Sequence, residues 1–334
     1  MHHLRIFICE IAFRRRVSLA RVSDVKHISH EIERSFGNNS AIRKHALTTP
    51  SPENPWQDAH RISRHTDDRS SPMTTTTAQS VFIREGETFV PTGLSRGPWD
   101  ENAQHGGAPA ALLAHVAQQS AGEEFFLARL TFELSRPVPI AALTVRAEAS
   151  KGRTARRVNL TLEHNGQTIG RAIALMLREQ PVMVPAATEQ RLEPAPGQCD
   201  ERFATPGMPS GEFFHHETMD IRVAHGSTHV PGRAAAWLRL RYPMIDGVET
   251  TPTMRAAAAA DFGNGLSWVL PFDEYLFTNT DLTVYLHRAP IGEWIGLDAE
   301  TIAQPNGVGL STSTLYDSEG RIGVAHQNLL IRAR

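Results

Sequence analysis

The chain has 334 residues, of which 40% are hydrophobic and 21% are charged, and its formal net charge is −2. This length is more than one ordinary domain needs, so two domains are predicted. The balanced charge argues against nucleic acid as a partner. No run of about 18 apolar residues exists, which excludes a transmembrane helix. Two cysteines, Cys9 and Cys199, are too few for a disulfide framework or a cysteine-based zinc site.

The first 72 residues differ in composition from the rest of the chain. They hold seven of the 16 histidines, scattered charges, and Pro and Ser clusters such as residues 49–52. Such a segment has too few apolar side chains to offset the entropy of ordering, so residues 1–78 are predicted to be a disordered extension. Met73 follows this polar tract, which makes it an alternative to Met1 as the start of translation. No signal peptide is recognisable, and the mildly acidic remainder favours a cytoplasmic protein.

An internal repeat emerges when the chain is aligned with itself. Residues 128–137 align with residues 280–290, with Leu, Thr, Leu and Arg at matching offsets. Both segments alternate apolar and polar residues, as half-buried strands do. Hairpin signals follow at Asn165-Gly166 and at residues 317–320, and an arginine comes 12 residues after the last glycine of each turn. Matching spacing across several elements indicates a duplicated unit.

Each copy also begins with an alanine-rich segment that favours a helix, at residues 108–116 and at residues 256–260. Each half is therefore predicted to be α+β, with a long helix wrapped by a curved antiparallel sheet. We expect an N-terminal domain at 79–180 and a C-terminal domain at 230–334. Residues 181–229, rich in Pro, Gly and His, are predicted to be a linker.

Three aligned positions are apolar in the first half and polar in the second. The pairs are Ala114 with Asp261, Leu127 with Asn279, and Ile173 with Gln327. A carboxylate that replaces a core residue is costly unless it is hydrogen-bonded, so three such replacements together predict a polar pocket with a function. One carboxylate and two carboxamides can hold a water and accept its proton. The alternative is that Asp261 only caps the helix or starts a turn, because residues 261–265 are also a turn sequence.

The first half carries His105-Gly106-Gly107 directly before its predicted helix. Glycines at a helix start let a carbonyl oxygen approach backbone N–H groups, and such donors stabilise an oxyanion by typically about 3 kcal/mol. The second half lacks glycine at that place and has Thr251-Pro252-Thr253 instead. One composite site is therefore predicted, with donors from one half and the base from the other, and its mirror-related counterpart is expected to be inactive. A tight turn into the helix is the alternative interpretation of the glycines.

These motifs resemble the double hot-dog acyl-CoA thioesterases (thioesterase II-like). The resemblance covers about residues 85–334 and rests on residues 104–107 with their helix, residues 258–262, residues 279–288 and Gln327. It implies a tandem hot-dog fold and hydrolysis of fatty acyl-CoA to the free acid and coenzyme A, as part of fatty acid metabolism. Hot-dog edges commonly pair, which allows a homodimer. No metal-ligand spacing is present outside the histidines of the N-terminal tail, and neither a metal nor a cofactor is expected.

By motif position the resemblance assigns catalysis to Asp261, Asn279 and Gln327. It assigns binding of the substrate carbonyl to His105, Gly106 and Gly107, with the acyl chain in a tunnel between the two helices. Asn279 stands where the family has Ser or Thr, and a carboxamide orients a water but does not relay a proton as a hydroxyl does. A non-catalytic or weakly active acyl-CoA- or lipid-binding protein therefore remains the alternative function.

Three further interpretations concern other residues. A hot-dog hydratase is disfavoured, because Asp281 and His287 are six apart without the Asn-Pro that such enzymes place between them. A serine nucleophile motif fails at Ser313, where a glycine is required. A cluster of arginines is either a binding site for coenzyme A phosphates or the solvated face of a strand; it consists of Arg153, Arg156 and Arg157.

Overall fold

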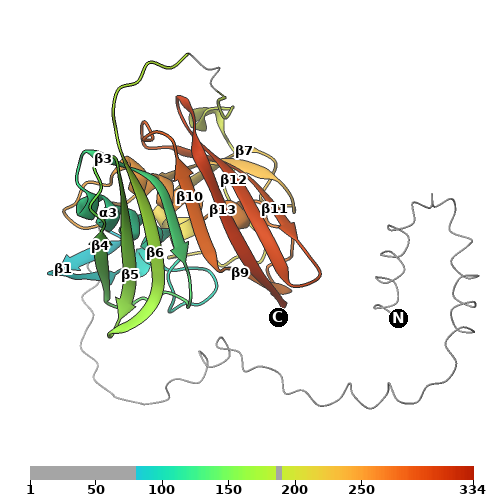
Figure 1. Ribbon diagram of the computed structural model, residues 1–334. Helices are drawn as coiled ribbons and strands as arrows, with labels where there is room; N and C mark the ends of the chain where they lie inside the picture. The colour runs from blue at the N-terminus through green and yellow to red at the C-terminus, as the bar shows by residue number, and fades with distance from the viewer. Residues whose placement is uncertain (1–79, 186–189) are drawn as a thin grey trace, which may run out of the picture. The chain divides into compact units, whose positions relative to one another are not determined.

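The computed structural model describes residues 80–185 and 190–334, so the predicted disorder of residues 1–78 concerns a segment outside the described residues. The described strands form one 13-stranded antiparallel sheet, on which two main helices pack (Figure 1). No helix in these two ranges is long and apolar enough to cross a membrane.

The order of elements occurs twice along the chain. The first half contains β1 (Phe82–Glu85), β2 (Thr88–Pro91), η4 (Gly93–Ser95), α3 (Gly107–Ala121), β3 (Phe125–Glu133), β4 (Leu143–Ala149), β5 (Ala155–His164) and β6 (Gln167–Arg178). The second half contains β7 (Met219–His225), β8 (Ala234–Leu240), α4 (Pro252–Ala260), α5 (Gly263–Leu266), β9 (Tyr275–Asn279), β10 (Asp281–Leu286), β11 (Ile295–Ala303), β12 (Val308–Asp317) and β13 (Gly320–Ala333). The short helices η5 (Pro196–Gln198) and η6 (Phe214–Thr218), the latter a π-helix, lie between the halves. This repetition confirms the predicted tandem hot-dog fold.

The two halves join along strands β3 and β10, which lie side by side in Figure 1. The sheet runs in the order β1-β2-β4-β5-β6-β3-β10-β13-β12-β11-β8-β7, and β9 pairs with β13. In the seam, Thr131 lies opposite Thr283. The two segments whose sequences align are therefore the strands that meet at the centre of the sheet.

Helices α3 and α4 pack against each other and against the apolar face of the sheet, within one continuous core. Leu112 and Leu113 of α3 are fully buried, as are most of the alanines of α4. The contact between the helices is tight, because a Cβ atom built at Gly107 would lie 2.5 Å from the carbonyl oxygen of Ala258. Contact this close leaves no room for an acyl chain between Gly107 and Ala258.

The segment predicted to be a linker differs from that expectation at its C-terminal end. Residues Met219–His225 form β7, which pairs with β8 at the edge of the sheet. Met219, Ile221 and Val223 alternate along β7 and are all buried. This short alternation lies beside stretches rich in His and Gly, which conceal it in the sequence.

Arg156 of the predicted basic cluster has a structural role. Its guanidinium donates hydrogen bonds to the carbonyl oxygens of Ala121, at the C-terminal end of α3, and of Gly152. It also lies 4.1 Å from the ring centroid of Phe125. A cation at this position satisfies free carbonyls and complements the helix dipole.

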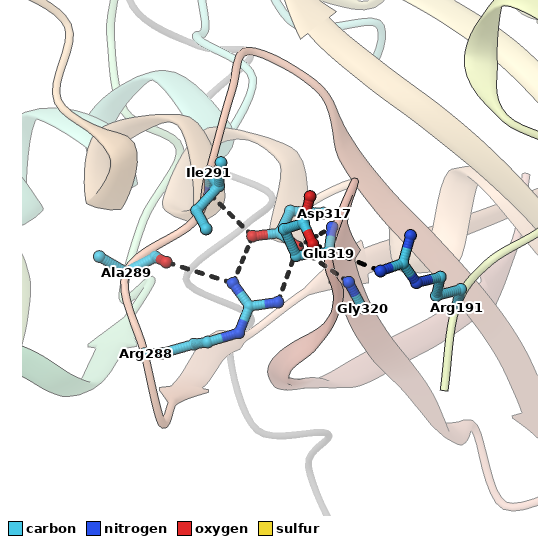
Figure 2. Close-up of polar contacts among 7 residues, drawn as sticks. All are labelled: Arg191, Arg288, Ala289, Ile291, Asp317, Glu319 and Gly320. Carbon is cyan, nitrogen blue, oxygen red and sulfur yellow. Dashed lines mark hydrogen bonds and ion pairs between the residues drawn. The ribbon is translucent and has the colours of Figure 1, made fainter. Parts of the chain in front are cut away.

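An ion pair with a buried carboxylate and a half-buried guanidinium joins the end of β10 to the turn between β12 and β13. Figure 2 shows the guanidinium of Arg288 donating to both carboxylate oxygens of Asp317. The same carboxylate accepts backbone N–H groups of Ile291, Glu319 and Gly320. Burial opposes ionisation of Asp317, but these donors outweigh it and lower the pKa of the carboxyl below its ordinary value. The pair fixes the hairpin whose second strand, β13, carries Gln327.

Candidate active site

Asp261 is placed by the end of helix α4. Thr251 caps the start of α4 by accepting the N–H of Met254, and Pro252 occupies the first turn, where its missing N–H costs nothing. The helix then runs through five alanines and ends at Asp261, which is 6% exposed. Asp261 therefore does stand at the helix end, as the alternative interpretation held, but its carboxylate bonds to side chains from other elements.

The carboxylate of Asp261 accepts hydrogen bonds from two carboxamides of the second half. Nδ2 of Asn279, at the end of β9, and Nε2 of Gln327, on β13, each lie 2.9 Å from Oδ1. Gln327 also donates to the backbone oxygen of Asp261 at 3.1 Å. The three residues predicted from the polar asymmetry are thus in direct contact around one carboxylate oxygen.

The other carboxylate oxygen is held by the first half of the chain. Nδ1 of His105 lies 2.9 Å from Oδ2 of Asp261 and 3.1 Å from the backbone N of Gly107. Nδ1 serves only one of these neighbours at a time: with a proton it donates to Asp261, and without one it accepts from Gly107. An ionised carboxylate is a pure acceptor and favours the first arrangement, which leaves the N–H of Gly107 available to another acceptor.

Both glycines at the start of α3, Gly106 and Gly107, are required by close approach. A Cβ atom at Gly106 would lie 2.9 Å from Oδ2 of Asp261, and one at Gly107 would meet Ala258 of α4. The helix start and the carboxylate come this close only because neither residue has a side chain. His105, Gly106 and Gly107 therefore lie at the same site as Asp261, as predicted.

The side-chain oxygens of Gln327 and Asn279 differ in whether they have a hydrogen-bond partner. Oε1 of Gln327 accepts the backbone N–H of Asn264, so both ends of this side chain are engaged within the protein. Oδ1 of Asn279 is buried and has no hydrogen-bond partner among the described residues. An unpaired buried acceptor is costly, and it is the kind of group that a bound water satisfies.

The register of the strands corrects one of the three aligned pairs. Ile173 lies opposite Thr131, whereas His326 lies opposite Thr283, the counterpart of Thr131. Ile173 therefore corresponds to His326, and both side chains lie on the outer face. The counterpart of Gln327 is Ala174, which is fully buried. The distance from the turn to the aligned position differs by one residue between the two halves. Gln327 still replaces an apolar core residue, which is Ala174.

The same comparison identifies two buried serines that sequence reasoning missed. Ser311 lies opposite Gln327 on β12, and Ser313 lies two residues further along; they are 1% and 2% exposed. Their counterparts by register in β5 are Val158 and Leu160, which are also buried. An apolar-to-polar difference between the halves, applied to these strands, would have found them.

Phe214 is a second feature that the sequence did not reveal. It belongs to η6, in the segment between the halves, and its ring stacks on that of His105 with centroids 5.0 Å apart. Phe262 covers His105 at 4.5 Å. The next residue, His215, is 6% exposed, and burial together with the charge of His105 lowers its pKa to about 4. The histidine that touches Asp261 thus packs against two aromatic rings, which also stack on each other with centroids 6.0 Å apart.

Among the described residues, no group of three or more His, Cys, Asp or Glu is arranged to hold a metal ion. The site offers one carboxylate, three donors directed at it, one carboxamide oxygen that is unpaired among the described residues, and one backbone N–H at a helix start. These are the groups that a hydrolytic reaction at a carbonyl carbon requires.

Comparison with known proteins identifies the family. Residues 95–177 match the N-terminal domain of the acyl-CoA thioesterase family, and residues 196–331 match its C-terminal domain. The chain therefore belongs to the double hot-dog acyl-CoA thioesterase family. Membership supports hydrolysis of thioesters as the class of reaction.

Solved structures agree on the fold. A proposed thioesterase II from Thermobifida fusca YX superposes with a TM-score of 0.60 at 18% identity, covering 78% of this chain and 99% of its own. A hot-dog protein of unknown function from Alicyclobacillus acidocaldarius gives 0.59 at 16% identity, covering 77% and 97%. A proposed thioesterase from Novosphingobium aromaticivorans gives 0.57 at 20% identity, covering 76% and 99%. No curated protein sequence matches the chain at a significant level.

Proposed function

We propose that the protein hydrolyses acyl-CoA to the free acid and coenzyme A, with Asp261 as the group that takes the proton from the attacking water. The observation that carries this proposal is the pairing of an ionisable carboxylate with the unpaired Oδ1 of Asn279 in one buried site. A water bound to Oδ1 lies beside the carboxylate because Nδ2 of the same carboxamide donates to it. Water, base and anchor are then within hydrogen-bond reach of one another.

The reaction follows from these positions. The water oxygen attacks the thioester carbon while its proton passes to Asp261, and the carbonyl oxygen becomes an oxyanion that the N–H of Gly107 stabilises. When the C–S bond breaks, the electron pair goes to sulfur, and the proton on Asp261 is returned to the leaving thiolate. The products are the carboxylic acid and free coenzyme A, so that atoms and charges balance.

The contacts assign different tasks to the remaining residues. Gln327 is proposed to orient the carboxylate of Asp261 rather than the water, because both ends of its side chain are engaged by the protein. His105 is proposed to hold the other carboxylate oxygen and, by donating to it, to leave Gly107 free for the substrate. Asn279 then performs the water-holding task that the family gives to a hydroxyl.

Release of free thiol from a series of purified acyl-CoA substrates tests the proposal, with Asp261→Asn as the key variant. The substitution keeps the size of the side chain but removes its basicity, and general-base catalysis is typically worth about 100-fold to 10,000-fold. We expect a loss of kcat in that range and an unchanged fold by circular dichroism. Asp298→Asn, which removes a surface partner of Arg233, is the matched control and should retain wild-type activity.

The alternative function gives a different result in the same experiment. A protein that only binds acyl-CoA would release thiol at the same slow rate in the wild type and in Asp261→Asn. That outcome would refute the enzymatic proposal, and calorimetric titration with acyl-CoA would then report the binding function directly.

A further inference from the structure

Beside the proposed site lies a second apolar cluster, separate from the main core and built mostly of aromatic rings. The cluster also contains Leu270, Tyr275 and Ile331; we call its other five members the aromatic wall, namely Trp99, Met208, Trp268, Phe272 and Phe277. Trp99 stacks on Phe272 with centroids 4.3 Å apart and meets Phe277 edge-on at 4.9 Å. These geometries are the favourable ones for aromatic pairs, so the rings form a defined surface.

The aromatic wall is continuous with the residues that hold the water in the proposed mechanism. Phe277 and Asn279 are two residues apart on β9, so their side chains lie on the same face of the strand. Asn264 links the two groups, because its side chain donates to the carbonyl of Phe277 and its backbone N–H donates to Gln327, both at 3.2 Å. A ligand whose carbonyl lies at Asp261 therefore has this wall as its neighbour.

Two members of the wall come from outside the C-terminal half. Trp99 lies in the loop before His105, and Met208 lies in the segment between the halves, with its Cε atom 3.9 Å from the Cβ position of Gly265. Both are half-buried, whereas the other three side chains are at most 6% exposed. Trp99 and Met208 thus form the accessible rim of the wall, and an unbranched thioether side chain adapts readily to ligands of different size.

The chemistry of the wall distinguishes between the two arms of a thioester. The thiol arm of coenzyme A carries amides and phosphates, whereas the acyl arm is apolar. None of the five members of the wall is charged, and the indole N–H of Trp268 is already bonded to the carbonyl of Thr228 at 3.0 Å. We infer that the aromatic wall binds the acyl group of the substrate and that Trp99 and Met208 determine which acyl lengths are accepted. This inference rests on the proposed thioesterase function.

Kinetics with straight-chain acyl-CoA substrates of increasing length test this inference in both directions. Met208→Ala enlarges the space at the rim and should raise kcat/KM for long substrates relative to short ones, by about fourfold for each additional buried methylene. Met208→Trp fills the same space and should shift the preference to shorter chains. Trp99→Ala should act in the same direction as Met208→Ala.

Trp294→Ala is the matched control, because Trp294 is also half-buried but packs in a different cluster, between Arg222 and Arg239. It should leave the length preference unchanged. Wild-type length preference in both Met208 variants would overturn the inference. If the wild type hydrolyses no substrate, the proposed function fails, and calorimetric titration of Asp261→Asn and its Met208 double variants with the same acyl-CoA series still decides whether the wall selects acyl length.

Discussion

Alanine substitutions at the two adjacent glycines at the start of α3 are expected to separate stability from catalysis. The Cβ atom of Gly107→Ala would lie 2.5 Å from the carbonyl oxygen of Ala258, a backbone atom that retreats only if α4 moves as a whole. The Cβ atom of Gly106→Ala would lie 2.9 Å from Oδ2 of Asp261, which belongs to a side chain. The backbone at Gly106 has a φ of −59°, which suits alanine. An added methyl group at Gly107 therefore meets rigid backbone, whereas one at Gly106 meets a side chain that can move.

The expected magnitudes follow from this difference. Overpacking a close-packed core costs about 1–3 kcal/mol, and in a domain of this size each kcal/mol lowers Tm by about 2–4 °C. Gly107→Ala should therefore lower Tm by about 5 °C. Gly106→Ala should lower Tm less than Gly107→Ala does, because the obstacle is a side chain that can shift, although the shift strains its hydrogen bonds to Asn279, Gln327 and His105. A displacement of a reacting group by about 1 Å can cost about 100-fold in rate, so kcat should fall by roughly that factor.

Thermal unfolding followed by circular dichroism and thiol release from acyl-CoA, measured on both variants, check these expectations. A Gly107→Ala protein with the Tm of the wild type would show that the contact between α3 and α4 is not as tight as described. A Gly106→Ala protein with wild-type kcat would show that Asp261 does not need its present position, which would count against its proposed role.

Two further predictions concern buried ionisable groups. His215 has a pKa of about 4 when folded and about 6.5 when unfolded, so the unfolded chain binds the proton first and stability is lost as pH falls from 6.5 to 4. The free energy of unfolding by urea should fall by about 3 kcal/mol over that range from this group, and His215→Gln should remove most of the slope; an unchanged slope would contradict the assignment. Asp317→Ala should lower the free energy of unfolding by about 3 kcal/mol, because Arg288 is left without its carboxylate. The exposed pair Arg191–Glu319, seen beside it in Figure 2, is the control, and Arg191→Ala should cost less than about 0.5 kcal/mol.

The tandem fold could be predicted because the two halves of the sequence repeat the same local patterns. A single alternating strand such as residues 128–137 is weak evidence for a fold. Residues 280–290 agree with it in residue type and in distance to the next turn, and this agreement between distant segments is much stronger evidence. The structure adds that these two segments become β3 and β10 and pair with each other. Alignment shows that two segments are equivalent, whereas pairing between them depends on packing across the whole sheet.

The site was predictable where a polar residue replaces an apolar one at a fixed distance from a helix or a turn. Asp261 and Asn279 meet this condition, and the structure brings both together with His105. Gln327 was predicted correctly as a polar replacement, but it was paired with Ile173 instead of Ala174. A bulge or a longer turn changes the number of residues between a turn and an aligned position, whereas the hydrogen bonds between strands show the true correspondence. Phe214 and Met208 could not be found in this way, since they belong to a segment that has no counterpart in the other half.

The mirror-related place explains why duplication leaves a single site of this kind. There Thr253 and Met254 stand at the positions of Gly106 and Gly107, so side chains occupy the space that the glycines leave open. Thr253 and Leu127 line the same narrow apolar slot between α4 and the central strands. Ala114, at the position of Asp261, is fully buried and has no group that accepts a proton. Two helices related by a twofold axis make two contacts between the start of one helix and the end of the other. Here one contact is apolar packing. Only the other combines a glycine helix start with a carboxylate.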